Sequence, residues 1–232
     1  MRVLALDAAT QACSVALLSG DELICRYAEQ KLPHTQQLLG MVEAVLAEAQ
    51  LSLSMLDGIA ASIGPGAFTG ARISVAVAQG LAFGADLRVV GVTTLEALAF
   101  QAMRRGAVHA LACLDARMGE VYWGCFTADS TRGLAANSPS RVGPPETVVL
   151  PTSAVHRGIG RGFTAYPALA ALPGLELDPE DSRVLPHARE FATLGALRLA
   201  QAEGLDPADL RPLYLRDKVA LTEAERRQQK AP

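Results

Sequence analysis

The sequence predicts an α/β protein of two lobes, in which mixed sheets are flanked by helices. Two observations support this fold class. Through residue 103, segments with the alternating pattern of strands are interleaved with segments whose apolar residues recur at helical spacing. After Gly106 two strand patterns follow each other directly, which indicates that a second sheet begins there. With 232 residues and 50% apolar side chains, the chain is long enough to bury a core in each lobe.

The first thirty residues predict a meander of three strands. Ser19-Gly20-Asp21 is a hairpin turn signal between the second strand and the third. Alternating apolar residues place the strands at 3–6, 13–18 and 23–27. A helix over 35–50 follows, and its apolar face is unusually broad. That face either packs on its own sheet alone or serves both the sheet and a partner.

A strand at 57–63, the glycine-rich loop 64–70 and a second helix through about residue 84 come next. Thr69 is predicted to cap this helix. The loop either holds an anion on its backbone N–H groups or is a structural turn that sets the helix on the sheet. The structural interpretation is favoured, because the loop has no Gly-Lys-Ser/Thr ending and no GxGxxG pattern.

The second helix is almost uncharged, since Arg72 is its only charged residue before Asp86. Its small residues also let another helix approach closely. A helix with so little polar surface is usually covered on both sides, so another chain could supply the second cover.

A strand at 88–92 and a helix running from Thr93 to Arg105 complete the first lobe, which is predicted to span residues 1–103. The second lobe is predicted to span 104–186, and residues 187–216 form a C-terminal helix and a segment that pack back on the lobes. The strands expected in the second lobe lie at 108–114, 121–126 and 147–150, with one more short strand before the glycine-rich turn 158–162. Residues 217–232 are predicted to be a flexible tail.

Composition excludes several functional classes. The net charge of -3 is not typical of a protein that binds nucleic acid without a partner protein. The N-terminal residues fit neither a signal peptide nor a membrane span, so we expect a cytosolic protein. The four cysteines contain no CxxC pair and are expected to be buried, reduced thiols. The four histidines form no HxxxH or HExxH pair, so no metal site and no catalytic residue are predicted.

Asp7, at the end of the first strand, marks the pattern of the actin, sugar kinase and Hsp70 type (ASKHA) ATPases. In those proteins a glycine-bearing turn lies under the nucleotide phosphates, whereas here the turn is Asp7-Ala8-Ala9-Thr10. If this chain binds a nucleotide, Asp7 and Thr10 are the candidate nucleotide-binding residues. The side chains of Ala8 and Ala9 oppose tight binding, because they keep the backbone away from the phosphates. Alternatively, both residues only cap their turn through local side-chain hydrogen bonds.

Five separated motifs, taken together in this order, resemble the TsaB (YeaZ) family. They are the strand and turn from Leu4 to Leu17, Pro33-His34-Thr35, the segment from Gly64 to Arg72, Asp115-Ala116-Arg117 with Gly119-Glu120-Val121-Tyr122, and Tyr214-Leu215-Arg216. The chain departs from the family pattern at Ala67 and Ala71, where a Ser and a Leu or Val are usual. Ala67 lacks the hydroxyl of the usual serine, which could contact an anion, and this difference weakens the case that the loop binds a nucleotide.

The resemblance implies a bacterial cytoplasmic protein of the two-lobed ASKHA fold, needed to make threonylcarbamoyladenosine at position 37 of tRNA. It implies a scaffold without chemistry or a cofactor of its own that forms a heterodimer with its catalytic paralogue TsaD. ATP and a metal ion belong to the partner complex, which a TsaE-like ATPase joins. The tRNA is reached through that complex, and no membrane is involved. A homodimer is the other assembly implied.

The resemblance also gives a role to the two apolar helices, 35–50 and 69–84, which in this family form a bundle with the matching helices of TsaD or of a second copy. The residues expected at that interface are Leu38, Leu39, Val42, Val45, Ile73, Ala76, Val77 and Gly80. The rival hypothesis is an enzyme of the ASKHA class, a small-molecule kinase or ATPase or a peptidase, built on Asp7.

Overall fold

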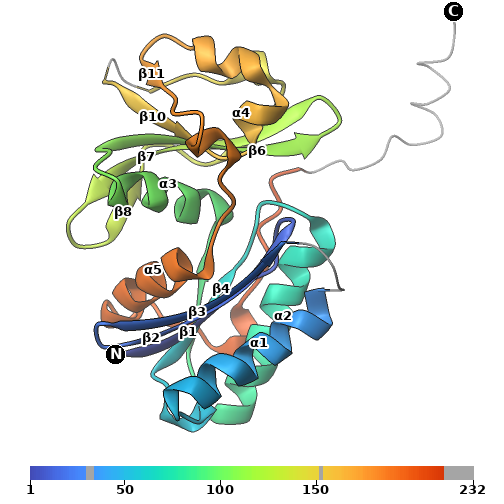
Figure 1. The fold of residues 1–232 in the computed structure, drawn as a ribbon, viewed down its shortest axis with the longest axis vertical. Coiled ribbons are helices and arrows are strands. Elements are labelled where there is room, and N and C mark those ends of the chain that lie inside the picture. The colour runs from blue at the N-terminus through green and yellow to red at the C-terminus, as the bar shows by residue number, and fades with distance from the viewer. Residues whose placement is uncertain (30–33, 152–153, 217–232) are drawn as a thin grey trace, which may run out of the picture.

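The computed structural model describes residues 1–29, 34–151 and 154–216, and in them helices and sheets alternate in layers (Figure 1). Two predicted features, Pro33 of the second motif and the tail 217–232, lie outside the described residues. No helix in the described part of the chain is long and apolar enough to cross a membrane.

The first sheet has five strands in the order β3-β2-β1-β4-β5. The meander predicted from the first thirty residues is confirmed, with Ser19 paired to Glu22 across the hairpin turn. The first three strands are antiparallel, whereas β4 and β5 run parallel to β1 and enter through helical crossovers. The strands are β1 (Arg2–Asp7), β2 (Ala12–Ser19), β3 (Glu22–Glu29), β4 (Gly58–Ser62) and β5 (Val89–Val92).

Helices α1 (His34–Ala49) and α2 (Phe68–Ala85) cover one face of this sheet (Figure 1). The prediction that Thr69 caps α2 is wrong. The helix begins at Phe68, and Ala67 stands at its N-cap position without a side-chain hydrogen bond. The reason is that the Ala67 N–H donates to the carbonyl of Ala9 at 2.7 Å, which fixes the start of the helix by backbone contact.

Helices α3 (Thr94–Arg104) and α5 (Ala188–Ala200) lie between the two sheets (Figure 1). The predicted start of α3 is confirmed by a complete capping box. The Thr93 hydroxyl accepts the Glu96 N–H at 3.1 Å, and the Glu96 carboxylate accepts the Thr93 N–H at 2.7 Å. The predicted boundary at residue 103 falls in the last turn of α3.

The second sheet has six strands, in which β11-β10-β6-β7-β8 form the path and β9 pairs with β7. The strands are β6 (His109–Arg117), β7 (Glu120–Asp129), β8 (Gly133–Ala136), β9 (Arg141–Gly143), β10 (His156–Ile159) and β11 (Leu175–Glu176). Helix α4 (Gly162–Ala165) covers its outer face. Short 3-10 helices occupy Leu53–Met55, Pro145–Thr147, Pro167–Ala171, Asp181–Arg183 and Pro207–Asp209.

The strand predicted at 147–150 is wrong. Residues Pro145–Thr147 form a 3-10 turn, and the buried side chain of Val148 packs in the outer core of the second sheet instead of joining a ladder. Two strands that the sequence did not predict, β8 and β9, lie in this region. Both pair with β7, which has ten residues and therefore offers an edge long enough for two short partners.

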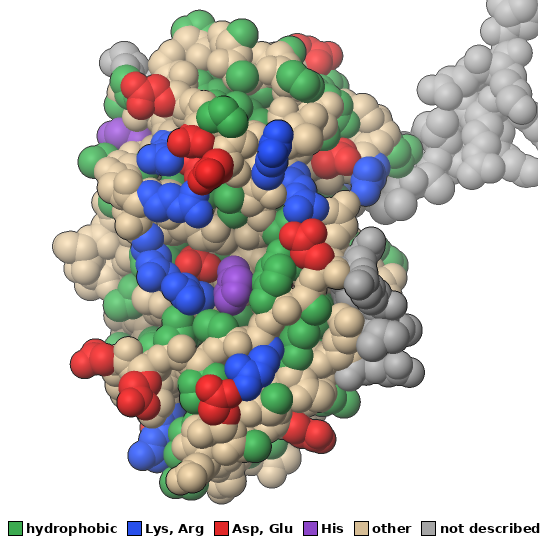
Figure 2. Space-filling model, in the orientation of Figure 1, with side chains coloured by type: hydrophobic (Ala, Val, Ile, Leu, Met, Phe, Trp, Pro, Cys, Tyr) green, Lys and Arg blue, Asp and Glu red, His purple; other side chains and the backbone are tan. Residues whose placement is uncertain are grey.

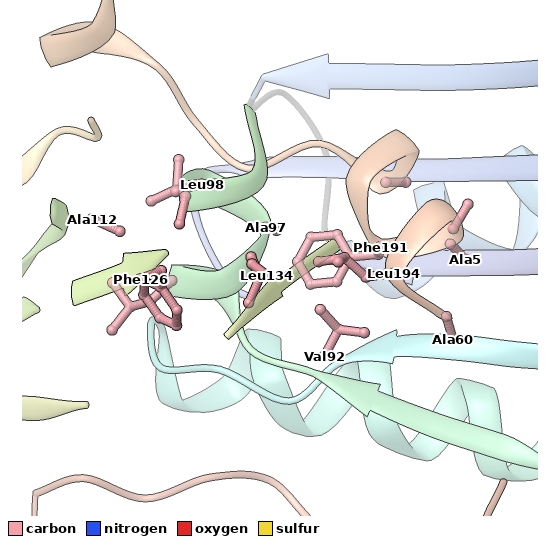
Figure 3. Packing of buried hydrophobic residues seen from close by; sticks show 14 of the residues in the cluster. Ala5, Ala60, Val92, Ala97, Leu98, Ala112, Phe126, Leu134, Phe191 and Leu194 are labelled. Carbon is pink, nitrogen blue, oxygen red and sulfur yellow. The ribbon is translucent and has the colours of Figure 1, made fainter. Parts of the chain in front are cut away.

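One hydrophobic cluster joins the lobes (Figure 3). It contains Ala5 and Ala60 of the first sheet, Ala112 and Phe126 of the second, and the side chains of α3 and α5 between them. Phe191 of α5 is fully buried in this cluster. The lobes are thus packed against a shared core and are not two units joined by a linker alone.

Candidate partner surface and interlobe cleft

The turn after β1 is closed by its own side chains. Asp7 is fully buried, and its Oδ1 accepts the Ala9 N–H at 3.0 Å. The Thr10 hydroxyl accepts the Ala12 N–H at 3.3 Å, and the Ala8 N–H donates to the Ser74 hydroxyl of α2 at 2.8 Å. The bonds to Ala9 and Ala12 are the local ones that the capping interpretation of Asp7 and Thr10 predicts, whereas the bond to Ser74 joins the turn to α2.

The glycine-rich loop lies directly on this turn. A Cβ atom at Gly66 would lie 2.1 Å from the carbonyl oxygen of Ala9, and one at Gly70 would lie 2.0 Å from that of Ala8. Both positions therefore need glycine, because only glycine lets two backbone segments approach this closely. The geometry favours the structural interpretation of the loop.

A cleft of about 500 Å³ opens between the lobes beside this turn. Its two arginines are already paired with protein groups. The Arg161 guanidinium donates to Gln11 at 2.8 Å and to the carboxylate of Glu29 at 3.2 Å, and Arg117 pairs with Asp115 at 3.0 Å. Within the ranges that the structure describes, no three His, Cys, Asp or Glu side chains gather where they could hold a metal ion.

The cysteines are free thiols, as predicted, although Cys25 is only partly buried. Burial raises the pKa of the Cys13 thiol to about 12 and that of Cys125 to about 11. Burial also raises the pKa of Cys113 well above its ordinary value. Because the thiolate is the nucleophile, these cysteines offer no reactive group for peptidase chemistry at neutral pH.

Burial raises the pKa of Asp7 from its ordinary value of 3.8 to about 6, against the opposing hydrogen bond from the Ala9 N–H. The folded chain therefore keeps a proton that the unfolded chain has released between about pH 4 and 6. Stability from this group is complete below that window, falls as the pH rises through it, and is lost above about pH 6.

We expect Asp7→Asn to raise the free energy of unfolding above pH 6 by up to about 3 kcal/mol and to leave it unchanged near pH 3.5. The neutral amide keeps an acceptor for the Ala9 N–H and removes the cost of a buried charge. Urea unfolding at pH 3.5, 5 and 7.5 measures the effect, with the exposed Asp21→Asn as the matched control. A gain that does not grow with pH would contradict the role of the buried charge.

The same variant tests the rival enzyme hypothesis. If the purified chain hydrolyses ATP and Asp7→Asn abolishes the turnover, Asp7 is a catalytic carboxylate. A chain without measurable turnover in either form leaves the capping role as the explanation of this residue.

The predicted interface residues divide between core and surface. Leu38, Val42 and Val45 are buried against the first sheet, because their helical spacing points them inward. These three residues are therefore not part of the candidate partner surface. Leu39, one position further round the helix, is 47% exposed.

On α2, Ala76 and Gly80 are exposed, and Ile73 and Val77 are half-buried beside the core. Phe83, which the sequence analysis did not include, is 62% exposed. The sequence signal for Phe83 is its position three residues after Gly80, because this spacing places both residues on the same side of α2. We call the surface formed by Leu39, Ile73, Ala76, Val77, Gly80 and Phe83 the α1–α2 face.

Two distant motifs meet at the second cavity, of about 520 Å³, next to the cleft. The Arg216 guanidinium pairs with Glu120 and donates to the carbonyl of Ala116 at 3.1 Å. Arg72 lies 3.2 Å from the centre of the Phe68 ring and 5.1 Å from that of Tyr214. The segment that ends at Arg216 thus contacts both lobes on this side. The sequence predicted that residues 187–216 include a segment that packs back on the lobes, but it did not predict these contact partners.

Comparison with known proteins gives consistent matches over most of the chain. A family model described as "TsaD: tRNA N6-adenosine threonylcarbamoyltransferase" matches residues 28–141. The tRNA threonylcarbamoyladenosine biosynthesis protein TsaB of Escherichia coli (strain K12) is 38% identical, over 95% of this chain and 96% of that protein. Its namesake in Haemophilus influenzae (strain ATCC 51907 / DSM 11121 / KW20 / Rd) is 33% identical, over 94% and 95%.

A solved structure, YeaZ from Pseudomonas aeruginosa, is 40% identical and superimposes with a TM-score of 0.85, covering 92% of this chain and 99% of that one. Together with the family model, this similarity confirms the predicted two-lobed fold of the ASKHA type.

Proposed function

Because the chain belongs to the TsaB family, we propose that it is a non-catalytic scaffold that binds and activates a TsaD-like transferase. Its relatives take part in tRNA threonylcarbamoyladenosine biosynthesis, and so does this chain. The specific role is to hold the transferase in its active form while the group is transferred to the adenosine at position 37 of tRNA. The complex lies in the cytoplasm in this proposal.

The α1–α2 face is the observation that carries the proposal. Leu39 and Phe83 expose about half or more of their side chains there, and α2 has no charged residue other than Arg72. Exposed apolar side chains on two neighbouring helices that cover one face of a sheet are typical of a protein interface. The small residues Ala76 and Gly80 allow a partner helix to approach the backbone closely.

The cleft supports the non-catalytic part of the proposal. Asp7 is buried and bonded to its own turn, and the arginines of the cleft are paired. ATP and a metal ion are accordingly assigned to the partner complex, which a TsaE-like ATPase completes. Figure 2 shows basic side chains interspersed with acidic ones on one face of the molecule, so we assign the main tRNA contacts to the complex.

The first experiment mixes this chain with the TsaD-like protein of the same organism. Light scattering is expected to show a defined heteromer, and tRNA modification is expected to depend on the chain. If the two proteins stay apart and modification proceeds without this chain, the scaffold proposal is rejected. A stable homodimer that the transferase does not dissociate would assign the α1–α2 face to a second copy.

Leu39→Glu and Ala76→Glu are expected to weaken the heteromer by at least about 100-fold, because a carboxylate buried without a partner costs about 3 kcal/mol or more. Both residues are exposed in the single chain, so the variants should fold. Val149→Glu is the matched control, since Val149 is 61% exposed but lies in the second lobe, away from this face. Unchanged association of both variants, measured by size-exclusion chromatography with light scattering, would place the interface elsewhere.

A further inference from the structure

Two histidines far apart in the sequence meet on the second sheet. Strands β6 and β10 are parallel, and their register pairs Ala110 with Arg157. His109 and His156 each come one residue earlier, so they are neighbours on the same face of adjacent strands. Their ring centres lie 5.3 Å apart and their planes differ by 35°.

Hydrogen bonds fix the same tautomer on both rings. The Nδ1 of His156 lies 2.9 Å from the carbonyl oxygen of Ala154, which can only accept, so Nδ1 carries the proton. The Nδ1 of His109 lies 2.9 Å from the hydroxyl of Thr127. That hydroxyl donates to Asn137 at 3.0 Å and so accepts from His109. In the neutral form of each ring, this tautomer leaves a lone pair on Nε2.

The bond to Thr127 also indicates where the Nε2 of His109 lies. Thr127 is on β7, which flanks β6 on the side opposite to β10. Because the outward directions of the two imidazole nitrogens diverge widely, the Nε2 of His109 is directed away from Thr127 and β7, that is, toward the β10 side of β6. The Nε2 of His156 is buried and has no hydrogen-bond partner within the part of the chain that the structure describes.

The Nδ1 hydrogen bonds and the distance between the two rings are typical of histidines that bind a metal ion. Metal-binding histidines commonly hold their second nitrogen in a hydrogen bond to a backbone carbonyl or another acceptor, which orients the ring. Two imidazoles that share an ion at about 2.0–2.1 Å from each nitrogen have ring centres about 5 Å apart. Imidazole suits late first-row divalent ions such as Zn²⁺, Ni²⁺ and Cu²⁺.

We propose that His109 and His156 bind one late first-row divalent metal ion through their Nε2 atoms and thereby link β6 to β10. Two protein ligands leave further coordination positions for water. His156 is fully buried and His109 is partly exposed, so the ion enters from the His109 side. The exposed side chains of Val108 and Val155 mark this end of the sheet as a surface. No HxxxH or HExxH spacing in the sequence predicts this site, because its two ligands are brought together only by strand pairing.

The test uses the untagged full chain, freed of metal by a chelator and titrated with Zn²⁺ in a calorimeter. We expect saturable binding of one ion per chain and a rise in the unfolding midpoint with added Zn²⁺. His109→Asn is expected to abolish both effects. This variant is preferred to a change at the fully buried His156, which could prevent folding.

Two further variants separate the site from other metal ligands. His187→Asn should bind Zn²⁺ as the wild type does, because His187 caps α5 and stacks on the Tyr27 ring, away from the second sheet, and asparagine is a good N-cap residue. Thr127→Val, which removes the bond that orients His109, should weaken binding by about tenfold or more. If Zn²⁺ binds His109→Asn as tightly as the wild type, or if no saturable binding is found, the proposal is overturned. The titration is done on this chain alone, so its outcome is independent of the scaffold proposal.

Discussion

Replacing Gly70 with alanine is expected to destabilise the chain by about 4 kcal/mol or more, whereas the same change at Gly84 should be neutral or stabilising by up to about 1 kcal/mol. Both glycines lie in α2, where alanine has the higher helix propensity. The difference is what the new methyl group meets. At Gly70 it would lie 2.0 Å from the backbone oxygen of Ala8, and at Gly84 nothing lies within 4 Å.

Urea unfolding of the two variants, followed by circular dichroism, measures this difference. The close contact at Gly70 involves a backbone atom of the β1–β2 turn, so a rotamer change cannot relieve it. If Gly70→Ala is as stable as Gly84→Ala, the loop and the turn can separate without cost, and the structural interpretation of the glycines fails.

Asp181→Asn is expected to cost about 3 kcal/mol of folding free energy. Asp181 is fully buried and pairs with two arginines, Arg105 at the end of α3 and Arg157 of β10, the second at 2.5 Å. Removing the charge leaves two guanidinium groups facing a neutral amide. These arginines are 46% and 31% exposed, so water can solvate their guanidinium groups when the carboxylate is removed. The expected cost therefore lies at the low end of the range for buried ion pairs.

The control for Asp181 is Glu48→Gln, because Glu48 forms an ion pair with Arg26 at the surface. Exposed pairs contribute about 0–1 kcal/mol, so this variant should hardly change the urea midpoint. Equal effects of the two variants would show that burial adds nothing to the pairing of Asp181.

Local patterns were sufficient where one sheet face or one helix face decides the structure. The meander, the start of α3 at Thr93 and the crossover helices follow from alternation, capping chemistry and helical spacing. Local patterns are not sufficient where contact with a distant segment determines the structure. The start of α2 is set by a backbone bond to Ala9, and strands β8 and β9 exist because β7 offers an edge to them.

The candidate site shows the same division. The sequence identified α1 and α2 as unusually apolar helices, but it could not tell Leu38, which is fully buried, from Leu39, which is exposed. Asp7 is found at the end of β1 as predicted, and its burial became evident only with the packing of the glycine-rich loop. The pairing of His109 with His156 depends on the register of two strands separated by most of the second lobe.

The bond from Ala67 to the β1–β2 turn has a consequence for the thermodynamics of the proposed association. Because the N-cap residue of α2 is bonded to the backbone of the β1–β2 turn, the start of the helix is held in place in the single chain, before any partner of the proposed complex binds. Association then loses rigid-body freedom but little chain entropy. The heat capacity change should therefore reflect the buried apolar area alone, without the larger contribution that accompanies folding on binding.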